Sequence, residues 1–326
     1  MNTRLLLLLL PGLLVSTPAL AQREALLAAA VPADGVVNLY RVNGTQLQLA
    51  KTAPVGKTPG QMCLDPTGST LFVGQQDPKG ASAIDLNSKA VARTFADGDL
   101  QAPDGCVVSP DGKKLYLIDR KANAVFVFAT GTGRLTKKIA VAEEPRRGLF
   151  LPNGKLVVGS DGASSLNLID PATDSVIRTI KAGPEGWNID PRILGLTPDG
   201  KFLVVAKVSA DILSFYNPDT LEFIVEYGVR RSPQALVMAP DGKTIYALSV
   251  AENLVAIVKD YNGKEWRAAA TIAAGPPLPL SMAGDPKGQY LYLSRRDGSI
   301  VVVEIATEKV TTIPEGKGGG ALVYRP

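Results

Sequence analysis

A short turn motif, Pro-x-Gly, recurs six times along the chain at nearly constant spacing. Its prolines are 44, 42, 46, 42 and 46 residues apart. Proline presets the first turn position, Asp or Asn can bond its own backbone, and Gly accepts a positive φ, so each motif predicts a tight reversal between two strands. The motifs occupy residues 65–68, 109–112, 151–154, 197–200, 239–242 and 285–288.

The segments between the turns predict further strands. A short apolar run follows each turn, and a second run, a polar hairpin and a fourth strand come after it. Residues 166–171 followed by 176–180 form one clear copy. No long stretch after the first 21 residues shows helical periodicity. Four short strands in each repeat are typical of the blades of a β-propeller, so we expect an all-β fold.

The two ends of the chain predict how the ring closes. A seventh hairpin occupies residues 37–55, and residues 320–326 match residues 60–66 in length and in the offsets of Gly and Pro. Residues 25–31 can then form the second strand of a blade whose first strand comes from the C-terminus. We therefore expect one domain at residues 22–326, a seven-bladed β-propeller of four-stranded antiparallel blades, with N- and C-terminal strands sharing one blade.

The sequence also resembles the YVTN family of β-propellers. The matching motifs are Ser-Pro-Asp-Gly-Lys at residues 109–113, Thr-Pro-Asp-Gly-Lys at 197–201, and Ile-Asp-Pro-Ala-Thr at 169–173. The resemblance covers residues 22–326 and implies a seven-bladed ring. Relatives of this fold include lactonases, heavy chains of quinoprotein amine dehydrogenases and surface proteins. This chain departs from the lactonase-type relatives because it has no histidine.

Residues 1–21 have the pattern of a secretory signal. Arg4 gives the positive start, residues 5–15 supply an apolar centre, and Ala19-Leu20-Ala21 is a small-x-small cleavage site. The alternative is a membrane anchor, but Pro11 and Gly12 interrupt a run that is too short to span a bilayer. We expect a periplasmic or secreted protein without a transmembrane segment after cleavage.

The composition excludes several kinds of chemistry. There is no histidine, which removes His-dependent nucleophiles and His-ligated metals and haem. The net charge of +4 is too small for a dedicated nucleic-acid binder. Glu185, Asn188 and Asp190 are of the right type for Ca²⁺ but lack the spacing of a calcium loop. We expect no metal, cofactor or assigned catalytic residue.

The two cysteines fall on neighbouring repeats. Cys63 lies three residues before Pro66, and Cys106 lies four residues before Pro110, which places both on innermost strands of consecutive blades. Export and an even cysteine count favour a Cys63–Cys106 disulfide. The alternative is two buried thiols that pack as small apolar residues.

The loops that lead into the inner strands meet at one mouth of a propeller's central channel. They carry two arginine pairs, whose forked guanidinium groups suit carboxylate or phosphate oxygens. The loop at residues 183–191 is longer than its counterparts and holds a tryptophan, a feature common on binding faces. The alternative is a solvated surface whose charges pair with one another. The candidate ligand-binding residues are Arg146, Arg147, Glu185, Trp187, Asn188, Asp190, Arg192, Arg230 and Arg231.

These observations favour an exported binding or interaction module, with an unknown protein or a small anionic ligand at the channel mouth. We expect a monomer. A first alternative is a hydrolase or lactonase-like enzyme that uses carboxylates, such as Glu143 and Glu144, or a metal. A second is a subunit of a quinoprotein-type dehydrogenase. Nucleic-acid binding through the arginine pairs is not favoured, and it would predict a steep loss of affinity with salt.

Overall fold

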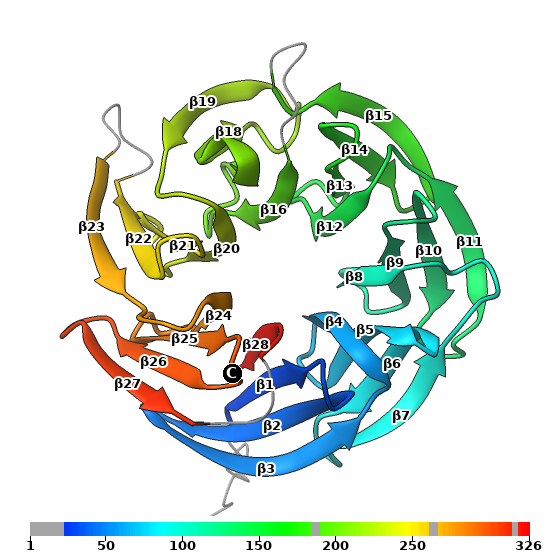
Figure 1. The fold of residues 1–326 in the computed structure, drawn as a ribbon. Coiled ribbons are helices and arrows are strands. Elements are labelled where there is room, and N and C mark those ends of the chain that lie inside the picture. The colour runs from blue at the N-terminus through cyan, green and yellow to red at the C-terminus, as the bar shows by residue number, and fades with distance from the viewer. Residues whose placement is uncertain (1–22, 184–189, 261–266, 315–318) are drawn as a thin grey trace, which may run out of the picture.

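The computed structural model describes residues 23–183, 190–260, 267–314 and 319–326. Seven four-stranded antiparallel sheets stand in a ring around a common axis (Figure 1). One short 3₁₀ helix, η1 (Val208–Ala210), is the only helix in the described ranges. This confirms the predicted all-β, seven-bladed architecture. The predicted signal lies outside the described residues.

In blades 1 to 6 the four strands follow one another in the sequence from the inner edge of the sheet, next to the central axis, to its outer edge. Blades 1 to 3 are β4 (Lys57–Leu64), β5 (Thr70–Asp77), β6 (Lys79–Asp85), β7 (Ala90–Phe95); β8 (Pro103–Val108), β9 (Lys114–Asp119), β10 (Ala124–Ala129), β11 (Leu135–Ala140); and β12 (Pro145–Phe150), β13 (Leu156–Ser160), β14 (Ser165–Asp170), β15 (Ser175–Lys181). Blades 4 to 6 are β16 (Pro191–Leu196), β17 (Leu203–Lys207), β18 (Ile212–Tyr216), β19 (Phe223–Gly228); β20 (Pro233–Met238), β21 (Thr244–Ser249), β22 (Leu254–Lys259), β23 (Arg267–Ala273); and β24 (Pro279–Gly284), β25 (Tyr290–Arg295), β26 (Ile300–Glu304), β27 (Lys309–Ile313).

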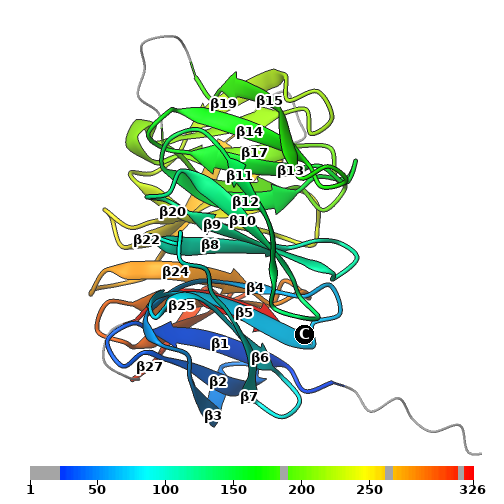
Figure 2. The same cartoon turned by 90° about the vertical axis from the view of Figure 1, so that its right-hand side faces the viewer.

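Blade 7 joins the two ends of the chain. Its order is β28 (Leu322–Arg325), β1 (Leu26–Val31), β2 (Val36–Asn43) and β3 (Gln46–Pro54). β28 pairs antiparallel with β1, so that Leu26 faces Arg325 and Ala29 faces Leu322. Seen from the side, β1 to β3 lie beside β5 to β7 of blade 1 (Figure 2). The shared closing blade expected from the sequence is therefore present.

The hydrophobic core lies between blades rather than inside them. Side chains from the two facing sheets form one cluster at each junction; between blades 1 and 2, for example, Phe72 and Phe95 pack with Leu117 and Phe128. The Phe95 and Phe128 ring centroids are 5.8 Å apart in an edge-on arrangement. The second and third strands of each blade are buried on both faces, which explains their continuous apolar runs.

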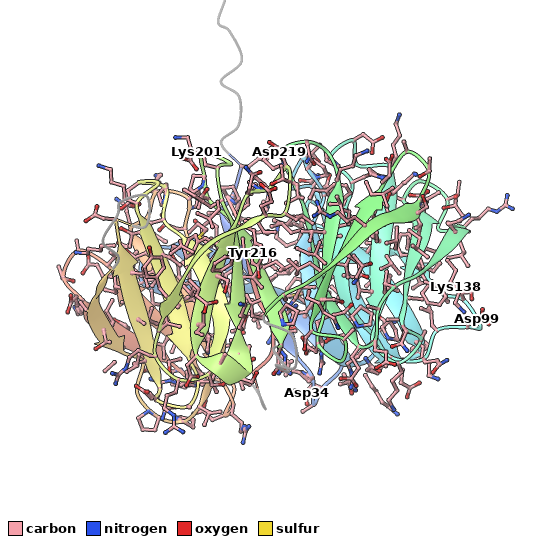
Figure 3. The ribbon with its side chains drawn as sticks, turned by 90° about the horizontal axis from the view of Figure 1, so that it is seen from above. Asp34, Asp99, Lys138, Lys201, Tyr216 and Asp219 are labelled. Atoms are coloured by element: carbon pink, nitrogen blue, oxygen red, sulfur yellow. A yellow bond between two sulfur atoms is a disulfide. The ribbon has the colours of Figure 1, made fainter. Side chains whose placement is uncertain are left out.

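The ring has two distinct faces. The Pro-x-Gly turns lie on one, which we call the turn face, and the loops leading into the inner strands lie on the other, which we call the mouth face. Figure 3 shows Lys201 and Asp219 on the turn face, opposite Asp34 on the mouth face. Because successive strands alternate in direction, the turns between second and third strands also lie on the mouth face.

A second periodic proline is the first residue of the inner strands of blades 2 to 6 and the third residue of the inner strand of blade 1. It lies seven residues before each turn proline and pairs with the end of the second strand: Pro59, Pro103, Pro145, Pro191, Pro233 and Pro279. A proline at the start of a strand costs no essential ladder hydrogen bond. In blades 2 to 6 the register of the sheet shifts directly after it, which leaves the next residue unpaired in a β-bulge, whereas in blade 1 the irregularity extends from Pro59 to Met62.

The two cysteines lie where the spacing predicts. Cys63 on β4 and Cys106 on β8 form a disulfide between adjacent blades, with Cα atoms 5.9 Å apart. Both side chains are partly buried against the cluster between blades 1 and 2. The bond joins the innermost strands, where the two sheets approach most closely.

Candidate functional site

The bulge residues build a charged group on one side of the mouth face. In blades 2, 3 and 4 the residue after the second proline is Asp104, Arg146 and Arg192, respectively. In blades 5 and 6 the same position holds Gln234 and Leu280, which carry no charge. A bulge takes its residue out of the ladder and re-aims the side chain, which is why such positions serve binding sites. Charge is thus concentrated over three consecutive blades.

Asp161 connects two of these arginines. It opens the turn between β13 and β14, and its Oδ2 accepts from the Nε of Arg146 and the Nε of Arg192, both at 3.0 Å. Arg192 belongs to the next blade, so the carboxylate bridges blades 3 and 4. The Asp161 side chain is only 6% exposed. Burial raises the pKa of Asp161, and the two arginines offset part of that rise.

The second carboxylate oxygen of Asp161 accepts no hydrogen bond from the described residues. This atom, Oδ1, is buried. An unpaired buried acceptor destabilises the folded protein. The side-chain hydrogen bonds that stabilise this carboxylate are therefore the two that Arg146 and Arg192 donate to Oδ2. The result is a fixed position for the Nε atoms of Arg146 and Arg192.

Arg147 is the least neutralised cation of the group. Its half-buried side chain forms no hydrogen bond or ion pair with the described residues. Burial lowers the pKa of Arg147 to about 10. Asp104 opposes this effect, and the neighbouring guanidinium groups of Arg146 and Arg192 add to it. At neutral pH the Arg147 side chain is still charged, with Asp104 as its strongest attracting charge and Arg146 and Arg192 as the repelling ones.

Glycines let the blades approach closely beneath this group. A Cβ at Gly105 would collide with the carbonyl oxygen of Arg146, and one at Gly159 would collide with that of Pro191. The backbone of each arginine-bearing strand therefore packs directly on a glycine of the preceding blade. This contact fixes the origin of the Arg146 and Arg192 side chains.

The remaining predicted residues fall into three groups. Asp190 joins the cluster, because its Oδ2 is 3.7 Å from Nη2 of Arg192. Glu185, Trp187 and Asn188 lie outside the described residues. Arg230 and Arg231 are exposed on the loop before β20, and Nη2 of Arg230 contacts Oε2 of Glu252 at 2.5 Å. No contact within the described ranges joins this second pair to the cluster.

Glu143 and Glu144, the carboxylates considered for an enzymatic alternative, do not form a close acid–base pair with each other in the described residues. Oε1 of Glu144 is 3.0 Å from Nη1 of Arg120. Both side chains are exposed.

Two further features of the described residues concern metal sites and membrane spans. Among these residues no group of three or more acidic or cysteine side chains could hold a metal ion. No helix of the described residues is long and apolar enough to cross a membrane.

Asp161 was missed by the sequence reasoning, which mapped only the loops before the inner strands to the mouth. The alternation of strand direction was the available signal, because it brings the turns after the second strands to the same face. The bulge positions could also have been found in the sequence, because in blades 2 to 6 each one directly follows the second proline of its repeat. The cluster can hold oxygen atoms of an anion between guanidinium groups, with one carboxylate fixing their positions.

Comparisons with known proteins support the architecture alone. No family model matches the chain, and no curated protein matches it. A Bacteroides fragilis protein described as a "putative 6-phosphogluconolactonase" is 18% identical, covers 94% of this chain and 99% of its own, and has a TM-score of 0.79. A functionally unknown protein from Desulfotomaculum acetoxidans is 15% identical over 92% of this chain and 98% of its own, with a TM-score of 0.77.

A third similar structure is the hydrazine synthase of Kuenenia stuttgartiensis. It is 22% identical, covers 81% of this chain and 88% of the matched chain, and has a TM-score of 0.69. These identities are too low to transfer an activity, because one fold hosts many unrelated functions. The chain is a seven-bladed β-propeller that carries an arginine–aspartate cluster on the mouth face of blades 2 to 4.

Proposed function

We propose that the protein is an exported binding module whose mouth-face cluster binds a carboxylate or phosphate group. The observation that carries this proposal is Arg147, a charged and half-buried guanidinium without a hydrogen-bonding partner in the described residues, beside two other guanidinium groups. An anion placed there would relieve the mutual repulsion that contributes to the lowered pKa of Arg147. The forked donors of arginine suit the paired oxygens of such a group.

Asp161 has a positioning role in this proposal. It occupies the Nε atoms of Arg146 and Arg192 and leaves the terminal Nη atoms of Arg146 without a partner in the described residues. A ligand oxygen would then bind the Nη groups of Arg146 and the guanidinium of Arg147. The balance of arginines and aspartates limits the attraction to close range, so this is a site for specific contact rather than for long-range capture.

Family and location are part of the same proposal. The Pro-Asp-Gly-Lys turns and the Ile-Asp-Pro-Ala-Thr hairpin support membership of the YVTN family, and the pattern of residues 1–21 supports export to the periplasm or medium. The N-terminal mass of the protein purified from its native host tests the second point. A mature chain that begins at Gln22 agrees with cleavage, and an intact N-terminus contradicts it.

The binding proposal is tested by calorimetric titration with inorganic phosphate and with 6-phosphogluconate, which carries both a phosphate and a carboxylate. We expect saturable binding at low salt, weakened by added salt. Arg147→Met should reduce the affinity at least tenfold, because it removes the unpaired guanidinium but keeps a side chain of similar length.

The matched control is Lys201→Met, which removes the same charge from an exposed position on the turn face (Figure 3). It should leave the affinity unchanged. Absence of binding by either probe contradicts the proposal. Equal weakening by both substitutions also contradicts it, because the effect would then follow net charge and not the cluster.

A second candidate function is opening of a lactone ring. The likeness to the protein described as a lactonase and the raised pKa of Asp161, a carboxyl group beside two arginines, favour it. The reaction adds water across the ring ester and yields a carboxylate and a hydroxyl group. Hydrolysis of the 6-phosphogluconic lactone that is lost in Asp161→Asn would support this function, and no rate above the uncatalysed reaction would exclude it.

A further inference from the structure

Two hollows lie side by side at the seam between blades 6 and 7, far from the arginine cluster. Their volumes are about 800 Å³ and about 500 Å³, and Ala25, Val42 and Asn43 line both. Both lie by the β2–β3 turn, and the second also by the turn at residues 285–288 and the C-terminus. Figure 1 shows β25 and β26 next to β1 and β2 at this seam. Together the two hollows form a groove on the turn face.

Aromatic rings form one end of the groove. Tyr290, Tyr292 and Tyr324 line the smaller hollow, and the rings of Tyr292 and Tyr324 stack with centroids 5.6 Å apart. The hydroxyl of Tyr292 donates to the carbonyl oxygen of Gly44 at 3.1 Å. Tyr292 is fully buried, whereas Tyr290 and Tyr324 are partly accessible. The rings are thus held by contacts across the seam.

Amide side chains surround the rest of the groove. Asn43, Gln46 and Gln48 line the larger hollow, and Asn43 and Gln289 line the smaller one. None of these four side chains has a hydrogen-bond partner in the described part of the chain. An amide offers two donors and one acceptor oxygen, so the set can both give and receive hydrogen bonds.

The charges in the groove are already balanced. In the larger hollow Glu24 pairs with Arg41, and also with Lys89 at 3.2 Å. In the smaller one Asp285 accepts from the backbone N–H groups of its own turn. There the guanidinium of Arg23 donates to the carbonyl oxygen of Thr67, and Lys287 lines the same hollow as Asp285. A strongly charged ligand gains little from such a surface.

We propose that this groove binds a neutral saccharide. A sugar ring offers a C–H face that packs on an aromatic ring and hydroxyl groups that both donate and accept hydrogen bonds. A purely apolar ligand would strip water from the four amides without replacing it. Two hollows of these sizes, joined through Asn43, give room for more than one sugar unit.

The test uses three soluble probes, cellotetraose, maltotetraose and chitotetraose, titrated into the full mature chain by calorimetry and saturation-transfer NMR. At least one should bind with saturation. Tyr290→Ala should weaken that binding at least tenfold, and Gln46→Ala, an exposed position that folding does not need, should weaken it severalfold.

The matched control is Lys243→Ala, at the position in blade 5 that corresponds to Gln289, on the same face. It should leave saccharide binding unchanged, as should Arg147→Met. Failure of all three probes at millimolar concentration overturns the proposal. So does binding that survives both groove substitutions, or binding that is lost in Arg147→Met, which would assign the saccharide to the mouth face.

Discussion

The Cys63–Cys106 bond gives the most quantitative prediction, because it closes a loop of known length. The two cysteines are 43 residues apart. In the chain-entropy model a loop of that length constrains the unfolded state by about 4 kcal/mol. With an unfolding entropy of about 2.1 cal/mol/K per residue over the roughly 300 residues of the mature chain, the melting temperature should fall by about 6 °C when the bond is absent.

The assay compares three samples by differential scanning calorimetry: the oxidised protein, the same protein with reductant, and Cys63→Ala/Cys106→Ala. Thiol titration of the denatured oxidised protein should first show no free cysteine. Both bond-free samples should melt near the same lower temperature, with the double variant slightly below because it loses partly buried sulfur atoms. Melting within about 1 °C of the oxidised protein in both would refute the loop-closure reasoning.

Two further predictions concern contacts between blades and in turns. Asp174 accepts hydrogen bonds from Nζ of Lys114 and the hydroxyl of Tyr116, each at 2.7 Å across blades 2 and 3, so Asp174→Ala should cost about 1–3 kcal/mol in a denaturation experiment; an unchanged midpoint would show that the contact is not formed. The Thr197 hydroxyl bonds the Asp199 carboxylate and lowers its pKa, so this pair stabilises the fold above the unfolded-state pKa and loses that effect as the pH falls through the lower folded-state value. Asp199→Ala should therefore lower the melting temperature at pH ~7 and make no difference near pH ~2; a difference that persists in acid would contradict this assignment.

The fold could be predicted from the sequence because its main signal is local. The Pro-Asp-Gly turn fixes backbone angles by itself, so its recurrence reports a strand pair in each repeat. The match between the two ends of the chain then determined the closing blade, and β28 pairs with β1 as expected. The cysteines followed from the same alignment of repeats, since their offsets from Pro66 and Pro110 place them on neighbouring inner strands.

The site was less accessible to sequence reasoning because it depends on register and on contacts between blades. Arg146 and Arg192 were selected as members of charged loops, but their common partner Asp161 is 15 and 31 residues away from them in sequence. The bulge after the second proline decides which loop residue is set apart from the ladder. Arg230 was selected as a candidate ligand-binding residue of the same mouth, and in the structure its guanidinium pairs with Glu252 of blade 5, which is the charge pairing that the sequence analysis gave as the alternative.

The most direct measurement is NMR of the arginine Nε–Hε groups during titration with inorganic phosphate. The proposed anion site predicts that the signals of Arg146, Arg147 and Arg192 shift together and saturate with a single affinity. The signal of Arg178, whose side chain bonds the carbonyl oxygen of Thr220 in the next blade, should not move. Uniform, unsaturable shifts of all arginines, or a stationary Arg147, would contradict it.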